Sequence, residues 1–428
     1  MDNHASGKRV LLLFMVLGFV LFLTGVSPAA TLTVGPGDYE YIQDAIDAAN
    51  PGDTINVKTG TYTEDLRIST NGLTLTAVDG PGTAEIVGDE VWDEVIYIDK
   101  GLGITIDGFK ISPGSGYETE GIYHDGGEVT DPLTITNNTI EGFSSAGFSA
   151  YWDDLDGTTF TFTGNTLTNG DYGTYGVNIG GIREATVNIS GNEISDYQYA
   201  IQVESNNDIV PLEIRIENNT ITGTGASDNE GIKMLNFALD TTYIVGNTIQ
   251  GNLYNGIYIN EIGSSGLPPV VYIEKNDVSG AKYGLYIDDL LYEHTYAAEV
   301  YIRYNTFHDN ENGFTFSSYD GAVGSTVSIV DNNFVGNSAY GMENMDSVTI
   351  NAQGNWWGDD TGPYHPVSNP TGLGNEVSDY VDYANWRTTA WEEENDESDS
   401  SSGCNTGILN PLFLLLLAPL GLLLRKSR

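Results

Sequence analysis

The sequence is poor in cysteine and in positive charge. Its 428 residues include a single cysteine, Cys404, so no internal disulfide can cross-link the chain. Lysine and arginine total 16, against 60 aspartate and glutamate residues, which gives a net charge of −44. A surface this acidic repels phosphate groups, so the composition excludes nucleic acid as a partner. Stability must come from a core of stacked aliphatic and aromatic side chains, for which the chain is long enough.

Histidine and methionine are also scarce, and this limits the metals that the chain can bind. The five histidines are scattered and show no ligand spacing for zinc or copper. Hard carboxylate oxygens are plentiful, so calcium is the metal that the composition favours, although no cofactor is required. A loop that ends in glycine offers the first candidate ligands, and a later pair offers the second: Asp153, Asp154 and Asp156, then Asp288 and Asp289.

An asparagine recurs through most of the chain at a nearly constant interval. Each time an apolar residue precedes it by three positions and another follows it by two, as in Ile189, Asn192 and Ile194. Such a period is typical of a solenoid. We expect the amides to form an internal structural ladder at a corner where asparagine itself adopts left-handed backbone angles. The nine positions lie 23 to 29 residues apart: Asn138, Asn165, Asn192, Asn219, Asn247, Asn276, Asn305, Asn332 and Asn355.

The residues between these asparagines predict three short strands in every repeat. Val300 and Ile302 alternate with Tyr301 and Arg303, which is the pattern of a half-buried strand. A second short strand follows each asparagine, and a third begins with a glycine, as in Gly256-Ile257. Stacked in parallel, three strands per coil predict an all-β fold, a right-handed parallel β-helix over residues 31–390. We expect a monomer.

The N-terminal region predicts export and a capped solenoid. Residues 1–30 carry two cations, an apolar run and small residues, as a secretory signal peptide does, with a retained N-terminal anchor as the alternative. The next pattern predicts an amphipathic helix from Asp38 to Ala49, capped by Asp38, that covers the open end of the solenoid.

Three motifs in this region resemble the opening of pectin-lyase-like right-handed β-helix proteins with PbH1-type repeats. They are residues 42–46 (Ile-Gln-Asp-Ala-Ile), 51–55 (Pro-Gly-Asp-Thr-Ile) and 60–64 (Gly-Thr-Tyr-Thr-Glu). The asparagine repeats resemble the same superfamily. The resemblance implies the fold but no activity, because the family includes lyases, hydrolases, epimerases and adhesins.

The C-terminal region predicts a plug, a tether and a sorting signal. Trp356, Trp357 and Trp386 are expected to close the solenoid. Residues 391–403 form an acidic, serine-rich linker, and residues 404–428 contain an apolar span and a basic end. Together with Gly403 and Cys404, this arrangement resembles prokaryotic sorting signals, in which the cysteine is the processing site. A plain membrane anchor is the alternative.

Candidate ligand-binding residues fall on the outward side of the glycine-led strands. Tyr123, Asn178, Gln202, Tyr258 and Tyr286 are expected to line up there with Ser149, Lys233 and Thr315. Lys233 is the cation of this row and therefore the candidate base for β-elimination, with Glu204 or Asn260 beside it. An inert surface would show much the same residues.

A second row comes four residues before the ladder asparagines. Its members are Arg215, Tyr243, Tyr272 and Tyr301. We expect these side chains to stack and stabilise the sheet, with a carbohydrate platform as the alternative.

These features favour an exported protein, anchored at the cell surface by its C-terminus, that binds glycans or other envelope components without catalysis. A polysaccharide lyase or glycoside hydrolase that acts on an extended acidic polysaccharide is the first alternative. A structural envelope protein is the second.

Overall fold

The computed structural model describes residues 28–392, except 90–91, 100–102, 115–118, 126–130, 152–156, 183–184, 206–212, 226–228, 236–240, 263–268, 292–296 and 320–323. The predicted signal peptide up to Ser27, the acidic linker beyond Glu392, Gly403, Cys404 and the C-terminal apolar span lie outside the described residues. Within those residues no helix is both long and apolar enough to cross a membrane.

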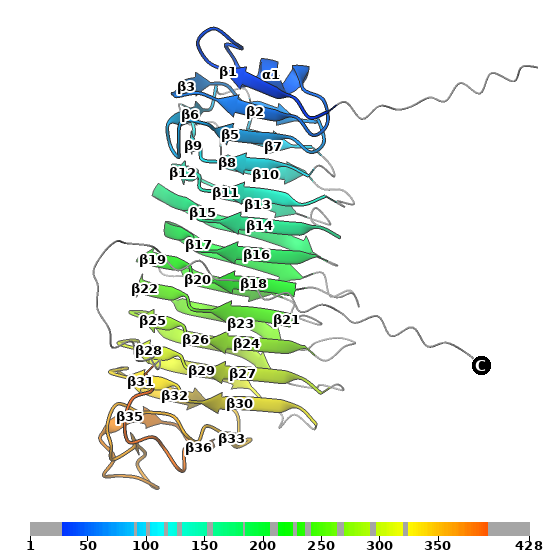
Figure 1. Ribbon diagram of the computed structural model, residues 1–428. Coiled ribbons are helices and arrows are strands. Elements are labelled where there is room, and N and C mark those ends of the chain that lie inside the picture. The colour runs from blue at the N-terminus through cyan, green and yellow to red at the C-terminus, as the bar shows by residue number, and fades with distance from the viewer. Residues whose placement is uncertain are drawn as a thin grey trace, which may run out of the picture. The chain divides into compact units, whose positions relative to one another are not determined.

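The chain forms a right-handed parallel β-helix, which confirms the predicted fold class (Figure 1). Successive coils from β1 (Thr31–Val34) to β30 (Thr326–Val330) each contribute one strand to a twelve-stranded sheet, called sheet A here. All of its neighbouring strands pair in parallel and in register. Sheet A contains β1 (Thr31–Val34), β2 (Thr54–Val57), β5 (Thr74–Ala77), β8 (Thr105–Asp107), β11 (Leu133–Thr136), β14 (Thr159–Thr163), β16 (Thr186–Ser190), β18 (Glu213–Glu217), β21 (Thr241–Val245), β24 (Val270–Glu274), β27 (Glu299–Arg303) and β30 (Thr326–Val330).

The strands that follow sheet A in each coil form two further walls of the solenoid. The first wall, B1, contains β3 (Gly60–Thr63), β6 (Ala84–Val87), β9 (Lys110–Ser112), β12 (Thr139–Glu141), β19 (Thr220–Thr224), β22 (Thr248–Asn252), β25 (Asp277–Ser279), β28 (Thr306–His308) and β31 (Asn333–Val335). The second wall, B2, contains β4 (Leu66–Ile68), β7 (Glu94–Ile98), β10 (Glu120–Asp125), β13 (Ala146–Tyr151), β20 (Glu230–Leu235), β23 (Asn255–Ile262), β26 (Tyr283–Leu290), β29 (Asn312–Ser318) and β32 (Tyr340–Asn344). Two long strands, β15 (Thr166–Ile182) and β17 (Glu193–Ser205), run through both walls.

The corner between sheet A and B1 holds the nine repeat asparagines, all of which are buried. From Asn165 onward, the Oδ1 atom of each accepts hydrogen bonds from the backbone N of the preceding asparagine at 2.9–3.0 Å and from its Nδ2 at 2.9–3.2 Å. The Oδ1 atom of Asn138 accepts the backbone N–H of Phe109 at 2.9 Å. The expectation that the ladder asparagines themselves adopt left-handed backbone angles is wrong. The residue before each asparagine adopts this conformation. Those residues have φ between 54° and 76°: Asn137, Gly164, Gly191, Asn218, Gly246, Lys275, Tyr304, Asp331 and Gly354. The preceding residue makes the turn, which leaves the asparagine side chain free to point into the core.

The capping helix is shorter than predicted and is capped by a different residue. Helix α1 spans Ile42–Ala48 and buries Ile42, Ala45 and Ile46. Asp38 does not cap it, because its carboxylate pairs with Lys58 at 2.8 Å. The carboxylate of Glu64 instead accepts hydrogen bonds from the backbone N–H groups of Ile42 and Gln43, at 2.8 and 2.9 Å. Glu64 follows β3, so the first coil itself caps the helix.

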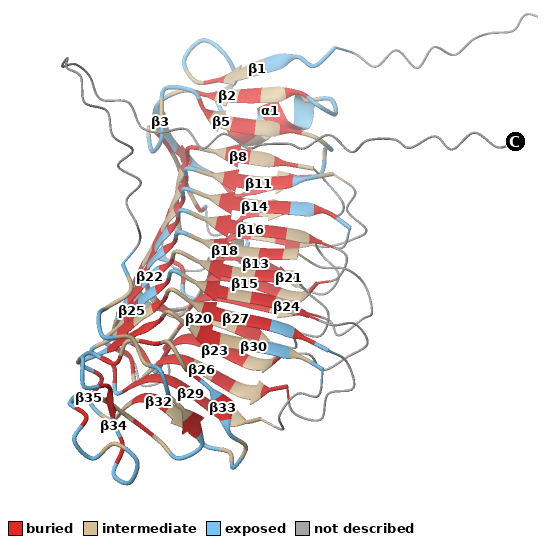
Figure 2. Cartoon of the chain, turned by 60° about the horizontal axis from the view of Figure 1, so that its bottom comes forward, coloured by how far each residue is buried: buried red, intermediate tan, exposed pale blue. Residues whose placement is uncertain are grey.

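The interior is a continuous stack of apolar side chains (Figure 2). Figure 2 shows buried residues recurring at the same place along successive strands of sheet A. At the C-terminal end, Trp357 is fully buried and stacks on Phe334, with ring centroids 4.8 Å apart. Trp386 packs only partly against the core and Trp356 is half-buried, so Trp357 is the tryptophan that enters the core. Four short strands complete this end: β33 (Ile350–Asn351), β34 (Pro363–Tyr364), β35 (Gly374–Val377) and β36 (Val381–Asp382).

Candidate functional site

The outward residues of the B2 strands form two continuous rows, which together we call the B2 face. Backbone register aligns the first row across eleven coils: Arg67, Tyr97, Tyr123, Ser149, Asn178, Gln202, Lys233, Tyr258, Tyr286, Thr315 and Glu343. The second row contains, on each strand, the residue three positions before the member of the first row. Its members are Glu94, Glu120, Ala146, Tyr175, Tyr199, Glu230, Asn255, Tyr283, Asn312 and Tyr340. Sequence reasoning placed Tyr123 to Thr315 in one row but missed its two ends and the whole second row.

Tyrosines dominate the N-terminal third of the B2 face. The ring centroid of Tyr123 lies 5.7 Å from that of Tyr97 and 6.3 Å from that of Tyr151. Tyr97 donates its hydroxyl hydrogen bond to the carboxylate of Asp125, and this bond raises the pKa of Tyr97. The pKa of Tyr151 is also raised, because the ring is partly buried. Half-exposed phenol rings are thus fixed in place by polar neighbours from adjacent coils.

Two of the expected binding residues, Asn178 and Gln202, hold the Tyr151 hydroxyl in place through hydrogen bonds. Asn178 is only 2% exposed, and its Nδ2 donates to Tyr151 Oη at 2.7 Å. Gln202 is 8% exposed, and its Nε2 donates to Asn178 Oδ1 at 3.2 Å. Both amides belong to the outward row, but their neighbours cover them. They position Tyr151 and offer little surface of their own.

Glu120 is a partly buried carboxyl group within the same third of the face. Ser149 Oγ donates to it at 2.6 Å and Ser145 Oγ at 3.2 Å. Burial raises the pKa of Glu120, and these two hydrogen bonds offset part of that rise. Glu94 lies opposite Glu120 on the preceding coil and forms an ion pair with Arg67 at 3.0 Å. The two carboxyl groups therefore sit in different electrostatic environments.

Lys233 lies near the middle of the B2 face and is held by its neighbours. Its Nζ is 3.4 Å from Glu230 Oε2 and 4.1 Å from the centroid of the Tyr199 ring. Tyr199 in turn stacks on Tyr175 at 5.4 Å. Glu204 emerges from β17 two residues after Gln202, which is the register partner of Lys233. The structure therefore places both candidate catalytic residues on the same face.

The C-terminal third repeats the pairing of tyrosines with oxygen-rich side chains. Tyr258 and Tyr286 stack at 5.9 Å with their rings only 10° from parallel. Tyr258 Oη donates to Asn260 Oδ1 at 3.1 Å, and burial raises the pKa of Tyr258 to about 12. Ser317 Oγ donates to Asp288 Oδ1 at 2.6 Å. Hydroxyl groups thus hold carboxylates on this part of the face as well.

The electrostatic balance of the B2 face is negative among the described residues. Its two cations, Arg67 and Lys233, each pair with a glutamate of the second row. Glu120 and Glu343 of the two rows, and Asp125 and Asp288 beside them, add negative charge and accept hydrogen bonds from hydroxyl groups. The face therefore attracts neutral hydroxyl donors and cations and repels polyanions.

On the inner side of β10, His124 is fully buried below Tyr123. Neither of its ring nitrogens has a hydrogen-bond partner. Burial lowers its pKa to about 4, so the ring is neutral at pH 7. Alternation along β10 predicts that the side chain of residue 124 points inward. It does not predict that a histidine there is buried without a hydrogen-bond partner.

The outer face of sheet A carries the second predicted row. Tyr243, Tyr272 and Tyr301 stack at 5.0 and 5.1 Å with their rings within 12° of parallel. The guanidinium of Arg215 lies 3.9 Å from the ring centroid of Tyr243. Each ring face in the middle of this stack is covered by another ring, so sugars cannot stack on it. The row stabilises the sheet.

The predicted calcium ligands Asp153, Asp154 and Asp156 lie outside the described residues. In the part of the chain that the structure describes, no three acidic, histidine or cysteine side chains gather as a metal site. Of the second candidate pair, Asp288 accepts from Ser317, and Asp289 lies beside Glu261 and Ser318 in the register.

A serine, a histidine and an aspartate come together at the C-terminal end, but they do not form a catalytic triad. His365 Nε2 lies 3.2 Å from Asp379 Oδ1, while its Nδ1 accepts the backbone N–H groups of Val367 and Ser368. The proton is therefore on Nε2, and Nδ1 has no capacity to take one from a nucleophile. The hydroxyl of Ser368 bonds to Tyr383 instead.

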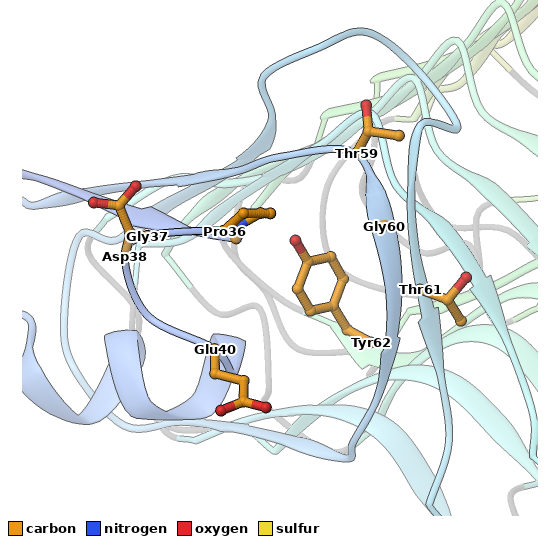
Figure 3. A pocket seen from close by; sticks show the side chains of 9 residues that line it. Pro36, Gly37, Asp38, Glu40, Thr59, Gly60, Thr61 and Tyr62 are labelled. Carbon is orange, nitrogen blue, oxygen red and sulfur yellow. The ribbon is translucent and has the colours of Figure 1, made fainter.

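A pocket of about 480 Å³ lies at the N-terminal end, between the loop 35–40 and strand β3 (Figure 3). Figure 3 shows the Tyr62 ring facing Pro36 across it. Tyr62 Oη donates to the carbonyl of Lys58 at 2.9 Å, and Lys58 neutralises Asp38. The pocket belongs to wall B1 and is separate from the B2 face. Most polar side chains that line the pocket already hydrogen-bond or ion-pair within the protein, so few of them could bind a ligand.

Comparison with known proteins supports the fold. A family model described as a right handed beta helix region matches residues 175–356. No curated protein matches the sequence. Two solved structures are similar: the PL6 family alginate lyase AlyGC, at 17% identity over 65% of this chain with a TM-score of 0.40, and a mutant of that lyase, at 14% identity over 67% with a TM-score of 0.30. The chain covers 39% and 40% of those proteins.

Proposed function

We propose that the B2 face binds an extended glycan without cleaving it, on a protein that is exported and held at the cell surface. The supporting observation is the alignment of tyrosine, hydroxyl and carboxylate side chains over eleven coils. Coils repeat at ~4.8 Å, so the half-exposed side chains of the rows present a long, shallow surface, in which Ser149, Asn178 and Thr315 are buried. Such a surface suits a polymer better than a small molecule, which needs a deep pocket.

The side chains of the face match the chemistry of sugars. The half-exposed rings of Tyr123, Tyr258 and Tyr286 offer apolar area for the C–H groups of a pyranose. The carboxylate of Glu120 accepts two hydroxyl groups from the protein and that of Asp288 accepts one, and both retain lone pairs for sugar hydroxyls. Because protein hydrogen bonds hold these groups in place, little entropy is lost on binding.

Charge narrows the class of glycan to neutral polymers and those that contain amino sugars. The whole chain has a net charge of −44, and both cations of the B2 face are paired with glutamates. A polyuronate would therefore meet long-range repulsion that the paired cations Arg67 and Lys233 do little to offset. The acidic polysaccharides of the first alternative are disfavoured on this ground.

The contacts of Lys233 argue for binding over β-elimination. A base in that reaction must take a proton from the sugar ring. Lys233 instead serves as a cation, between the carboxylate of Glu230 and the ring of Tyr199. Both contacts favour the charged ammonium over the neutral amine that a base requires.

A hydrolase is the second candidate, and the environment of Glu120 favours it. Glycoside hydrolysis uses one carboxyl group as the acid, with a raised pKa, and a second carboxylate beside it. Burial raises the pKa of Glu120, and Glu94, which is paired with Arg67, is its neighbour on the adjacent coil. If this candidate is right, Glu120→Gln abolishes the release of reducing ends.

The two ends of the chain would export the protein and attach it to the envelope. The signal peptide in residues 1–30 would export the protein, and the tail with Gly403 and Cys404 would attach it to the envelope. Binding by the B2 face uses side chains alone, so we propose that no cofactor is required. Calcium at Asp153, Asp154 and Asp156 would be structural.

Affinity electrophoresis tests the proposal. The full-length protein is run through gels that contain a neutral glucan, a neutral mannan, chitosan or alginate, at low and at high salt. We expect retardation by at least one neutral or amino-sugar polymer and none by alginate. Assays for reducing ends and for unsaturated uronates on the same polymers should remain at background. Free migration in every gel would contradict the proposal, and sustained product release would replace binding by catalysis.

A further inference from the structure

Two of the nine corners between sheet A and B1 carry an acceptor sequence for N-linked glycosylation. At these corners an asparagine precedes the ladder asparagine and a threonine follows it, in Asn137-Asn138-Thr139 and Asn218-Asn219-Thr220. At the other seven corners the residue before the ladder asparagine is glycine, lysine, tyrosine or aspartate. The Asn-x-Thr pattern is the acceptor for an oligosaccharide on exported proteins, provided that it lies at the surface.

The structure places both acceptor asparagines at the surface, in nearly the same geometry. Asn137 and Asn218 are exposed and have φ angles of 54° and 55°. The Oδ1 atom of each lies over a glycine of the next coil. A Cβ built on Gly164 would be 3.0 Å from Asn137 Oδ1, and one built on Gly246 would be 2.5 Å from Asn218 Oδ1. The next coil therefore leaves room for these side chains.

The neighbouring ladder asparagines could not serve as acceptors. The Nδ2 of Asn138 donates to Ile106 O at 3.0 Å and to Asn165 Oδ1 at 3.2 Å, inside the core. By contrast, Asn137 Nδ2 donates to the exposed carboxylate of Asp107 at 2.8 Å, a bond that water can replace. One side chain of each pair is thus committed to the fold, and the other faces solvent.

A third acceptor sequence, Asn188-Ile189-Ser190, provides an internal contrast. It lies in strand β16, in the middle of sheet A. Asn188 is half-buried between Thr161 and Arg215 of the adjacent coils. A glycan at this position would have to stand on a packed sheet face between two neighbouring side chains, whereas the corners project away from the solenoid.

We propose that Asn137 and Asn218 carry N-linked glycans and that Asn188 does not. The donor is an oligosaccharide linked to a polyprenyl phosphate, and a membrane-bound transferase joins it to the protein after export. A bond forms between Nδ2 and the sugar C1 while the bond from C1 to the phosphate oxygen breaks. The electron pair leaves with the phosphate, Nδ2 loses a proton, and no redox change occurs. The inference depends on the proposed export but not on glycan binding by the B2 face.

The two sites are placed so that they would leave the B2 face open. The corner between sheet A and B1 borders those two walls and not B2. The ladder positions Asn138 and Asn219 are three coils apart, so the glycans would stand roughly 14 Å from each other at ~4.8 Å per coil. They would shield the side of the solenoid away from the proposed ligand.

Mass spectrometry of the native protein, purified from its source, tests the inference. Because lysine and arginine are few, the protein is digested with a glutamate-specific protease. We expect glycan mass increments on the peptides that contain Asn137 and Asn218, and the unmodified mass for the peptide that contains Asn188. An unmodified side chain at either corner, or a glycan on Asn188, would overturn the inference.

Single variants expressed in the same source separate the acceptor sequence from the fold. Thr139→Ala and Thr220→Ala keep the asparagines and their corners but destroy the acceptor sequence, so each should lose one glycan completely. Thr166→Ala is the matched control, because Thr166 is the register partner of Thr139 and belongs to no acceptor sequence. It should leave both glycans in place. Retention of the glycan in Thr139→Ala would show that the attachment is not N-linked at Asn137.

Discussion

The outer face of sheet A and the B2 face share a backbone spacing but differ in how their side chains meet. On sheet A, like stacks on like: Tyr243, Tyr272 and Tyr301 form one stack, and threonines of earlier coils lie in register, as Thr74 and Thr105 do. On the B2 face, tyrosines also stack, as Tyr258 does on Tyr286, but unlike groups meet across coils as well: phenol with carboxylate, serine with glutamate, and lysine with a tyrosine ring. The same fold therefore presents one homogeneous surface and one mixed surface.

This difference separates a structural surface from a recognition surface. Both ring faces of Tyr272 are covered by neighbouring tyrosines, so its apolar area already contributes to stability. On the B2 face, Glu120 and Asp288 accept hydroxyl groups from the protein and retain further acceptor capacity. A regular row alone is thus no sign of function. What matters is which hydrogen-bonding groups remain for a ligand.

The largest expected effect lies under the B2 face, at His124. Its folded-state pKa of about 4 is below the ordinary value of 6.5, so the unfolded chain takes up the proton first as the pH falls. The neutral His124 therefore contributes on the order of 3 kcal/mol to the free energy of unfolding above pH 6.5. This contribution is lost as the pH falls from 6.5 to 4. His124→Leu should therefore lose less stability than the wild type between pH 7 and pH 4.5. Denaturant unfolding of both proteins at the two pH values measures this. Equal losses would contradict the buried, neutral histidine.

The next effect lies at the asparagine corner, on which both faces depend. Asn247→Ala removes the acceptor for the N and Nδ2 atoms of Asn219 and the donor to Ile216 O. Leaving these buried groups unpaired should cost about 2 kcal/mol. Thermal unfolding monitored by circular dichroism measures it. Thr248→Ala, at the exposed next position, is the control and should change the stability little.

Sheet A should respond to the loss of one ring in stability but not in binding. Tyr272→Ala breaks two stacked contacts and should lower the free energy of unfolding by about 1 kcal/mol. Its retardation in glycan gels should equal that of the wild type. A loss of retardation without a loss of stability would reverse the roles assigned to the two faces.

At Lys233 we expect an effect on stability but only a small one on binding. Lys233→Met keeps an apolar stem beside Tyr199, and Asn255 Nδ2 still donates to Glu230 Oε1 at 3.0 Å. Because the side chains of Lys233 and Glu230 are only 18% and 12% exposed, removal of the ammonium should lower the unfolding free energy by about 1 to 3 kcal/mol, whereas retardation by a neutral glycan should stay within twofold. Chemical denaturation and gel retardation of this one variant check both values. A larger loss of affinity would show that the cation contacts the ligand directly.

The fold was predictable because short-range sequence patterns, repeated in every coil, determine it. Strand alternation and the asparagine interval predict the coils, and the outward row from Tyr123 to Thr315 follows from counting within each coil. The helix cap was not predictable, because Glu64 meets the helix only after the chain has completed a coil. Burial across coils was hidden for the same reason. Asn178 and Gln202 point outward, but only their neighbours on adjacent coils show that they are covered.

The most direct test of the account compares matched losses of two stacked tyrosines on the two faces. Tyr258→Ala with Tyr286→Ala removes a pair from the B2 face, and Tyr272→Ala with Tyr301→Ala removes a pair from sheet A. Affinity electrophoresis in the gel that retards the wild type most is the measurement. The B2 variant should bind roughly thirtyfold more weakly, since each of the two rings contributes ~1 kcal/mol, and the sheet A variant should bind as the wild type does. Equal losses, or a loss in the sheet A variant alone, would contradict the assignment of recognition to the B2 face.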